Sequence, residues 1–160
     1  MRTTTSAGPA AGPTDVAGVV DPAELARRYA ALRHAPVFDA GRRWYRRLHA
    51  DTGHEAWLLT WLPGQGTDLH DHGGASGAFT VLAGTVAEDV VAPSGLSTLD
   101  WQEGAMRQFG PHHVHRVHNR GDSPAVTLHV YAPGLTAMSQ YAYADGELRL
   151  LRTDRAGVDW

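Results

Sequence analysis

The chain has 160 residues, including ten His, 14 basic and 17 acidic side chains, and its formal charge of −3 gives no electrostatic footprint for nucleic acid or an anionic membrane. Every basic side chain is Arg and Cys is absent, which excludes Schiff-base and phosphate-loop lysines, disulfides, thiolate metal sites and cysteine nucleophiles. No apolar run approaches the roughly 20 residues that span a bilayer, and the N-terminus lacks an apolar signal region. We therefore expect a cytoplasmic protein. We also expect no nucleic-acid or membrane partner, and a monomer.

The N-terminal part is predicted to contain a leader and one helix. Residues 1–20 consist mainly of Thr, Ala, Gly and Pro, and we expect a disordered leader before a single domain over residues 21–160. A helix is predicted over Pro22–Arg33. Asp21 can cap its first turn, a proline suits the first helical position, and Glu24 completes a capping-box spacing. The helix is expected to cover one end of the core.

From about residue 42 the pattern changes to short strands separated by turns rich in Gly, Pro, Asn and Asp. The predicted strands are, in chain order, Arg43–Ala50, Glu55–Leu62, Leu69–His72, Gly77–Leu82, Thr85–Ala92, Met106–Phe109, Val114–His118, Ala125–Tyr131, Tyr141–Ala144 and Glu147–Arg152. Many short strands at this spacing are typical of an antiparallel sandwich or barrel. We therefore expect a mainly β fold, a small antiparallel barrel with one N-terminal helix.

Two histidine clusters form the candidate metal site. His70 and His72 are two residues apart in a predicted strand, so both can point to one face, while Asp71 points away and is expected to be structural. A second cluster at residues 110–119 holds four further histidines, and strand periodicity does not choose a ligand among them. Imidazole suits zinc, copper, iron and nickel, and three nitrogens on one side of an ion leave positions open for substrate and dioxygen.

These spacings resemble the two motifs of the cupin superfamily and, within it, the cysteine dioxygenase type I family. The first motif, G(x)5HxH(x)3–4E(x)6G, is matched by Gly64, His70, His72 and Gly84. The second, G(x)5PxG(x)2H(x)3N, is matched by Gly104, His115 and Asn119, whereas Gly110 and His112 replace its proline and glycine. The resemblance implies a jelly-roll cupin with His70, His72 and His115 as metal ligands. It leaves His112, His113 and His118 as surface or rim residues.

Gly77 stands where the first motif has a glutamate ligand. Three neutral ligands leave a dipositive metal in need of anionic donors, which a substrate thiolate can supply. This arrangement is what the resemblance to cysteine dioxygenases implies, with Fe(II) held by three histidines and O2 as co-substrate. In mammalian members this position is a cysteine crosslinked to a tyrosine. A chain without cysteine cannot form that crosslink, and the glycine is similar to bacterial members.

One strand carries three polar residues with a period of two. Thr127, His129 and Tyr131 share a face of Ala125–Tyr131, and they resemble the Ser-x-His-x-Tyr sequence of the family, with Thr127 in place of the serine. The resemblance implies that Tyr131 contacts the substrate, that His129 holds Tyr131 and that Thr127 holds His129. These three residues are the candidate catalytic group.

An early strand offers a cation for a substrate carboxylate. The family has Tyr-x-Arg at this place, and Tyr45 with Arg47 fits it, so the resemblance implies that Tyr45, Arg47 and Tyr131 bind substrate. A guanidinium can grip a carboxylate through two parallel hydrogen bonds. Strand periodicity also puts Arg43 on the face of Tyr45 and Arg47, so Arg43 stays open as an alternative. Arg46 stays open as well, because it is the immediate neighbour of Arg47.

The function implied by the resemblance is that of an iron(II)-dependent dioxygenase of cysteine metabolism, which converts L-cysteine and O2 to cysteine sulfinate. Related enzymes acting on 3-mercaptopropionate carry glutamine where Arg47 is placed, so an arginine favours cysteine as the small-molecule thiol partner. The alternatives are a dioxygenase of 3-mercaptopropionate or another small thiol, a zinc or nickel metallo-cupin isomerase, and a cupin that only binds a small molecule.

Overall fold

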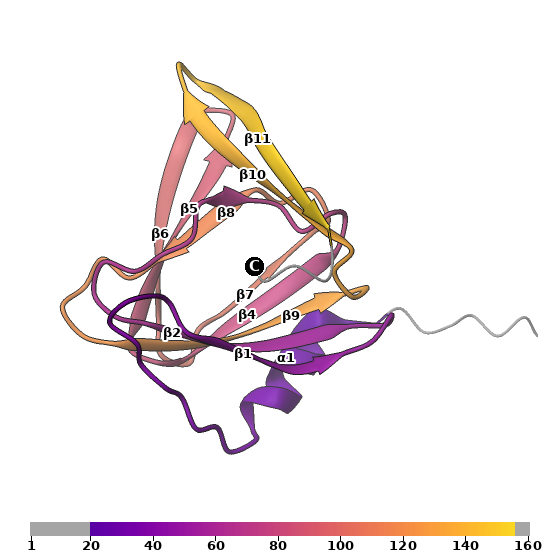
Figure 1. Ribbon diagram of the computed structural model, residues 1–160, viewed down its shortest axis with the longest axis vertical. Helices are drawn as coiled ribbons and strands as arrows, with labels where there is room; N and C mark the ends of the chain where they lie inside the picture. The colour runs from indigo at the N-terminus through magenta and orange to yellow at the C-terminus, as the bar shows by residue number, and fades with distance from the viewer. Residues whose placement is uncertain (1–19, 156–160) are drawn as a thin grey trace, which may run out of the picture.

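The computed structural model describes residues 20–155 and is drawn in Figure 1. Over these residues it has one helix, α1 (Pro22–Ala30), and the strands are β1 (Tyr45–Ala50), β2 (Glu55–Trp61), β3 (Leu69–His70), β4 (Ser76–Ala83), β5 (Thr85–Ala92), β6 (Gly95–Gln102), β7 (Met106–Phe109), β8 (His115–His118), β9 (Ala125–Ala132), β10 (Ala137–Ala144) and β11 (Glu147–Arg155). The expected disordered leader lies almost entirely outside the described residues.

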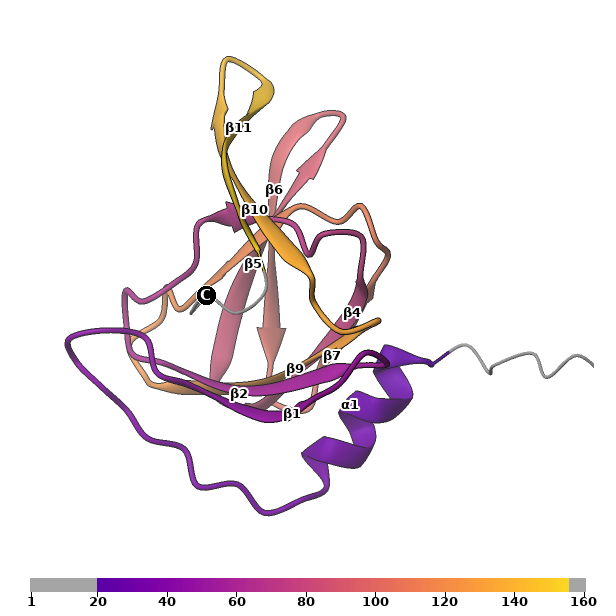
Figure 2. The same cartoon turned by 45° about the vertical axis from the view of Figure 1, so that its right-hand side comes forward.

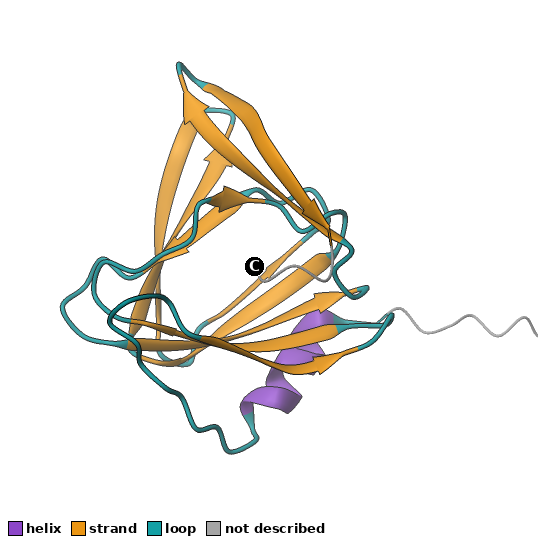
Figure 3. Cartoon of the chain, in the orientation of Figure 1, coloured by secondary structure: helices purple, strands orange, loops and turns teal. Residues whose placement is uncertain are grey.

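The strands form two antiparallel sheets that face each other. The first has the order β1-β2-β9-β4-β7, and the second has the order β11-β10-β3-β8-β5-β6. Loops join the sheets at both ends of the barrel (Figure 3). The expected mainly β barrel with one N-terminal helix is therefore confirmed. No helix of the described part is both long and apolar enough to cross a membrane.

Strand β9 has both of its faces buried, and it separates two clusters of core residues. One face looks into the barrel, where its Tyr131 packs with residues such as Trp61 and Phe79. The other face carries Leu128 and Val130, which pack beneath α1. Figure 2 shows the helix on the outer side of this sheet. Because the apolar residues of β9 face the helix, its alternate polar residues must point into the barrel.

The helix begins as expected and ends earlier than expected. The side chain of Asp21 accepts a hydrogen bond from the backbone N–H of Ala23 at 2.9 Å, as the cap assignment requires. The helix ends at Ala30 rather than at residue 33. The imidazole Nε2 of His34 lies 2.7 Å from the carbonyl oxygen of Tyr29, so a side chain satisfies a terminal carbonyl that another helical turn would have used.

One strand is missing from the sequence-based prediction. Strand β6 pairs only with β5, and most of its residues are exposed. Its sequence mixes Ser, Thr and Asp with isolated apolar residues, so it lacks the alternation by which strands are recognised. β6 matters for the site because its Trp101 donates a hydrogen bond to Glu88, which lies beside the metal ligands.

Candidate metal centre

Three buried histidines converge inside the barrel. His70 on β3 is paired directly with His115 on β8, and His72 follows two residues after His70, just beyond the end of the strand. The ring centroids are 4.9 Å apart for His70 and His72, 4.9 Å for His70 and His115, and 5.1 Å for His72 and His115. One ring nitrogen of each lies within 4.8 Å of the others. A near-equilateral triangle of rings with their nitrogens this close suits one ion bound on one side.

Hydrogen bonds decide which nitrogen faces the centre. Nδ1 of His70 donates to the carbonyl oxygen of Asp68 at 2.8 Å, and Nδ1 of His115 donates to the Glu88 carboxylate at 2.7 Å. Each ring therefore keeps its lone pair on Nε2. Nε2 of His115 and both ring nitrogens of His72 are buried without a hydrogen-bond partner among the described residues. Buried polar atoms are normally satisfied, so these free nitrogens fit a bound divalent metal ion.

The three imidazoles are in the neutral form that a metal requires. Burial lowers the pKa of each ring, because a charged imidazolium is poorly solvated inside the barrel. The pKa of His70 falls to about 3, with His115 contributing after burial. The pKa of His72 is well below its usual range. At neutral pH the lone pairs are therefore available without loss of a proton.

This burial predicts that the metal-free protein loses stability as the pH falls below about 6.5. His70, His72, His115 and His129 stay neutral in the fold, whereas in the unfolded chain they take up protons near their ordinary pKa of about 6.5. The unfolded state then binds more protons, so the free energy of unfolding falls by up to about 1.4 kcal/mol per pH unit for each histidine. Urea unfolding at about pH 7.5 and about pH 5.5 measures the loss.

The exposed His112 provides the control for this pH dependence. His112→Asn should leave the slope of unfolding free energy against pH unchanged, because His112 is exposed and is not one of the buried histidines. An unfolding free energy that stays constant between these two pH values would contradict the neutral assignment.

Gly77 leaves space that an aromatic ring fills. The ring of His72 stacks between Phe109, with centroids 5.1 Å apart, and Tyr131, at 4.7 Å. A Cβ on Gly77 would lie 2.5 Å from Cζ of Phe109 and 3.0 Å from Cδ1 of Tyr131. With Phe109 in this place, no side chain at position 77 has room to reach the metal centre. The glycine that replaces the carboxylate ligand thus makes room for the Phe109 ring that packs on His72.

Gly77→Ala is therefore expected to destabilise the protein by about 1–3 kcal/mol, the usual cost of overpacking a core. Gly110→Ala is the matched control, since a Cβ there meets nothing within 4 Å. Thermal unfolding of both variants tests this, and adding Phe109→Leu to Gly77→Ala should recover part of the loss. Equal stability of Gly77→Ala and the wild type would show that Phe109 does not occupy this space.

The polar face of β9 forms a continuous chain of contacts. Nε1 of Trp61 donates to Oγ1 of Thr127 at 2.8 Å. Oγ1 of Thr127 lies 2.9 Å from Nε2 of His129, and Nδ1 of His129 lies 3.3 Å from the hydroxyl of Tyr131. Burial lowers the pKa of His129 and raises the pKa of Tyr131, so both are uncharged at neutral pH. The three expected residues are brought together, in the expected order.

A cavity of about 190 Å³ adjoins the histidines, and its wall includes His70, His115, Tyr131, Tyr45 and Arg43. This volume is below the roughly 300–1,000 Å³ of pockets for drug-sized ligands, so it suits a small substrate.

Arg43, not Arg47, lines this cavity. Its guanidinium carbon lies 5.6 Å from the ring centre of Tyr45 and 5.2 Å from that of Trp61. No described carboxylate forms an ion pair with it. A half-buried guanidinium without a counter-ion is a ready partner for an anionic substrate.

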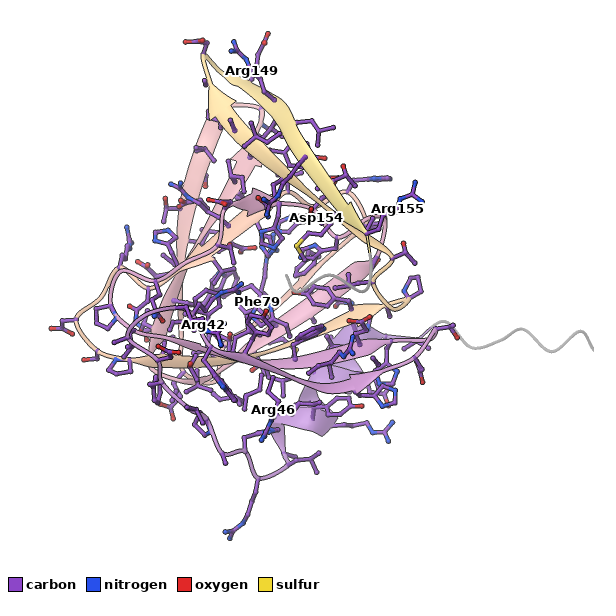
Figure 4. The ribbon with its side chains drawn as sticks, viewed as in Figure 1. Arg42, Arg46, Phe79, Arg149, Asp154 and Arg155 are labelled. Carbon is purple, nitrogen blue, oxygen red and sulfur yellow. The ribbon has the colours of Figure 1, made fainter. Side chains whose placement is uncertain are left out.

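Arg47, the residue expected to bind the substrate carboxylate, does not line this cavity. Arg47 is exposed, and its guanidinium carbon lies 5.4 Å from the ring centre of Trp57, its partner across β1 and β2. Trp57 itself lines the cavity, whereas Arg47 does not. Arg46 is exposed too, on the outer side of the sheet, whereas Phe79 lies inside the barrel (Figure 4).

A second histidine–carboxylate group lies on the β1–β2 hairpin. His49, Asp51 and His54 have ligand atoms within 4.8 Å of one another. The rings of His49 and His54, however, stack with centroids 4.2 Å apart and planes 16° from parallel. Lone pairs in stacked planes do not meet at one point. Asp51 instead accepts hydrogen bonds from His49 and from the backbone N–H of Gly53 and His54, which makes this group a structural turn.

Two residues near the centre are not singled out by the sequence patterns. Phe109 packs against His72, and Glu88 accepts a hydrogen bond from His115. His113, expected at the surface or rim, is largely buried and lies 2.9 Å from the same carboxylate. A glutamate in the middle of an otherwise apolar predicted strand is the signal by which Glu88 could be found, since a buried carboxylate needs partners.

Comparison with known proteins identifies the family and the fold. The family model for cysteine dioxygenase type I matches residues 19–144. Similar solved structures include the protein TT1209 from Thermus thermophilus (23% identity over 61% of this chain and 90% of that chain, TM-score 0.55), a conserved protein with a double-stranded beta-helix domain from Klebsiella pneumoniae (19%, 72% and 90%, TM-score 0.54) and an RmlC-like cupin protein from Desulfovibrio desulfuricans (22%, 64% and 93%, TM-score 0.54). At such identities these structures show the fold alone, and no curated protein matches the sequence significantly. The chain thus belongs to the cysteine dioxygenase type I family of metal-dependent dioxygenases and has the cupin fold.

Proposed function

We propose that the protein is an iron(II)-dependent dioxygenase that converts L-cysteine and O2 to cysteine sulfinate. The observation that carries the proposal is the pairing of three neutral, buried imidazoles with a small cavity lined by an unpaired cation. His70, His72 and His115 would hold the ion through neutral nitrogens. A ferrous ion in this place would supply redox chemistry with dioxygen and favour the thiolate form of the substrate.

Arg43 would bind the substrate carboxylate. It faces the same cavity as His70 and His115, so a carboxylate on its guanidinium leaves the rest of a small molecule beside the histidines. Two parallel hydrogen bonds would fix the orientation of the substrate, and holding reactants in the reacting geometry lowers the barrier without new chemistry. Tyr45, whose ring lies against Arg43, would keep the guanidinium in place.

Tyr131 would donate a hydrogen bond to the substrate. Oγ1 of Thr127 accepts from Trp61, and its other contact is Nε2 of His129, so its own proton is directed to that nitrogen. A neutral His129 then carries its proton on Nδ1, which donates to the hydroxyl oxygen of Tyr131. This leaves the phenolic proton of Tyr131 free to point into the cavity that Tyr131 lines. The hydrogen-bond relay of Thr127, His129 and Tyr131 thus directs the phenolic proton of Tyr131 toward the cavity.

Oxygen uptake by the iron-loaded protein with L-cysteine, 3-mercaptopropionate and cysteamine tests the function. Cysteine is expected to give the highest kcat/KM. Cysteamine should give the lowest kcat/KM, because it has no carboxylate for Arg43 to bind. A preference for 3-mercaptopropionate would make that thiol the substrate in place of cysteine. No thiol-dependent oxygen uptake with any of the three would overturn the proposal. Metal analysis of protein purified without added metal separates iron from the zinc or nickel of an isomerase.

A further inference from the structure

Glu88 is a fully buried carboxylate directly behind one metal ligand. It lies on β5, and its side chain is 0% exposed. Oε1 accepts from Nδ1 of His115 at 2.7 Å and from Nε2 of His113 at 2.9 Å. Oε2 accepts from Nε1 of Trp101 at 3.0 Å and lies 3.3 Å from Nε of Arg107. Both oxygens are thus used, and Glu88 is not part of the cavity wall.

These donors satisfy both oxygens of the buried carboxylate. Burying a carboxylate is costly unless it keeps its partners, so we expect a role for Glu88. Glu88 takes no part in the contacts among Thr127, His129 and Tyr131.

We propose that Glu88 is a positioning residue of the metal centre, which holds His115 with Nδ1 protonated and its Nε2 lone pair directed at the ion. A carboxylate that accepts from the outer nitrogen of a ligating imidazole fixes its orientation and raises its basicity. The proposal rests on the proposed metal centre but not on the identity of the thiol.

Glu88 also differs from the hydrogen-bond partners of the other two ligands. The three histidines are neutral, and Gly77 supplies no carboxylate. His70 donates to a backbone carbonyl and His72 makes no hydrogen bond through its ring. Among the described residues, Glu88 is therefore the one carboxylate that hydrogen-bonds a ligand.

The surrounding groups hold Glu88 rather than form a second ion site with it. Glu88, His113 and His115 have ligand atoms within 4.8 Å of one another, but both rings lie at hydrogen-bond distance from the same oxygen. A cation among them would also face Arg107. The ring of His113 stacks on Phe109 at 4.8 Å, and Phe109 stacks on His72, so the same network braces two of the three ligands.

Cobalt(II) affinity of Glu88→Gln, measured by chelator competition on metal-free protein, tests the role. A loss of about 10–100-fold is expected, as for other partners of metal-ligating histidines. Asp89→Asn is the matched control. Asp89 is the next residue of the same strand and also buried, yet it binds Thr98 and Arg116. It should keep the wild-type affinity within about threefold, and an equal affinity of Glu88→Gln and wild type would overturn the proposal.

The tautomer of His115 gives a readout that a merely structural role would not move. In nitrogen-labelled, metal-free protein, NMR should show His115 protonated on Nδ1 in the wild type and in Asp89→Asn, and a mixture of tautomers in Glu88→Gln. An unchanged tautomer in Glu88→Gln would overturn the proposal. If Glu88→Gln does not fold, Arg107→Gln is used, with a smaller affinity loss expected in the same direction, and no loss would overturn it.

These outcomes are distinct from those of the proposed function. Cobalt(II) binding with the expected difference, together with no oxidation of any thiol, would sink the dioxygenase assignment and leave the role of Glu88 standing. Absence of cobalt(II) binding by the wild type would overturn both.

Discussion

His115→Ala is expected to reduce bound iron from a stoichiometric amount to a trace and to abolish thiol oxidation. The two remaining imidazoles cannot hold the ion with the affinity of three, and the substitution also leaves the buried carboxylate of Glu88 without its closest donor. Elemental analysis of purified protein and an oxygen electrode measure the two effects. His112→Ala, an exposed histidine of the same segment, should change neither.

Tyr131→Phe separates metal binding from turnover. It keeps the ring that stacks on His72 and removes only the hydroxyl at the end of the β9 contacts. Iron content should stay at the wild-type level, while turnover falls roughly 10–100-fold for the loss of one hydrogen bond to a charged group. Full iron and full activity in His115→Ala would show that the ligand assignment is wrong, and full activity in Tyr131→Phe would remove the relay from the mechanism.

Arg43→Gln is expected to lower kcat/KM for L-cysteine by about 10–100-fold, chiefly through KM, because a bidentate, charge-assisted contact with the carboxylate is lost. The residual activity with cysteamine should not change, since that substrate has no carboxylate. Kinetics with the two substrates thus distinguish loss of substrate binding from general damage.

Arg47→Gln is the matched control for Arg43. It removes an exposed guanidinium that packs on the ring of Trp57 and does not line the cavity, so kcat/KM should stay within about threefold of the wild type. A larger effect of Arg47→Gln than of Arg43→Gln would restore the sequence-based assignment and contradict the role of the cavity cation.

The ligands and the polar strand could be predicted because they follow local rules. A period of two places Thr127, His129 and Tyr131 on one face, and the cupin spacing selects His115 from a group of histidines that periodicity leaves unresolved. The same rule placed Arg43 and Arg47 on one face. It does not say which position along the chain lies over a cavity, and in the structure only Arg43 of the two lines it.

The surroundings of the ligands could not be predicted because they depend on register between distant strands. Glu88 meets His115 only when β5 pairs with β8, and it meets Trp101 only when β6 pairs with β5. β6 has too irregular a pattern to be recognised. Phe109 contacts His72 because Gly77 leaves a space opposite it, and neither residue signals that pairing in the sequence.

The most direct test of the central claim is the fate of dioxygen. Iron-loaded protein would be supplied with L-cysteine under isotopically labelled dioxygen, with oxygen uptake and the mass of the product followed together. The account predicts cysteine sulfinate with both of its new oxygen atoms labelled, equal consumption of dioxygen and cysteine, and none of this with His115→Ala. Cystine as the only product, or a sulfinate without label from dioxygen, would contradict it.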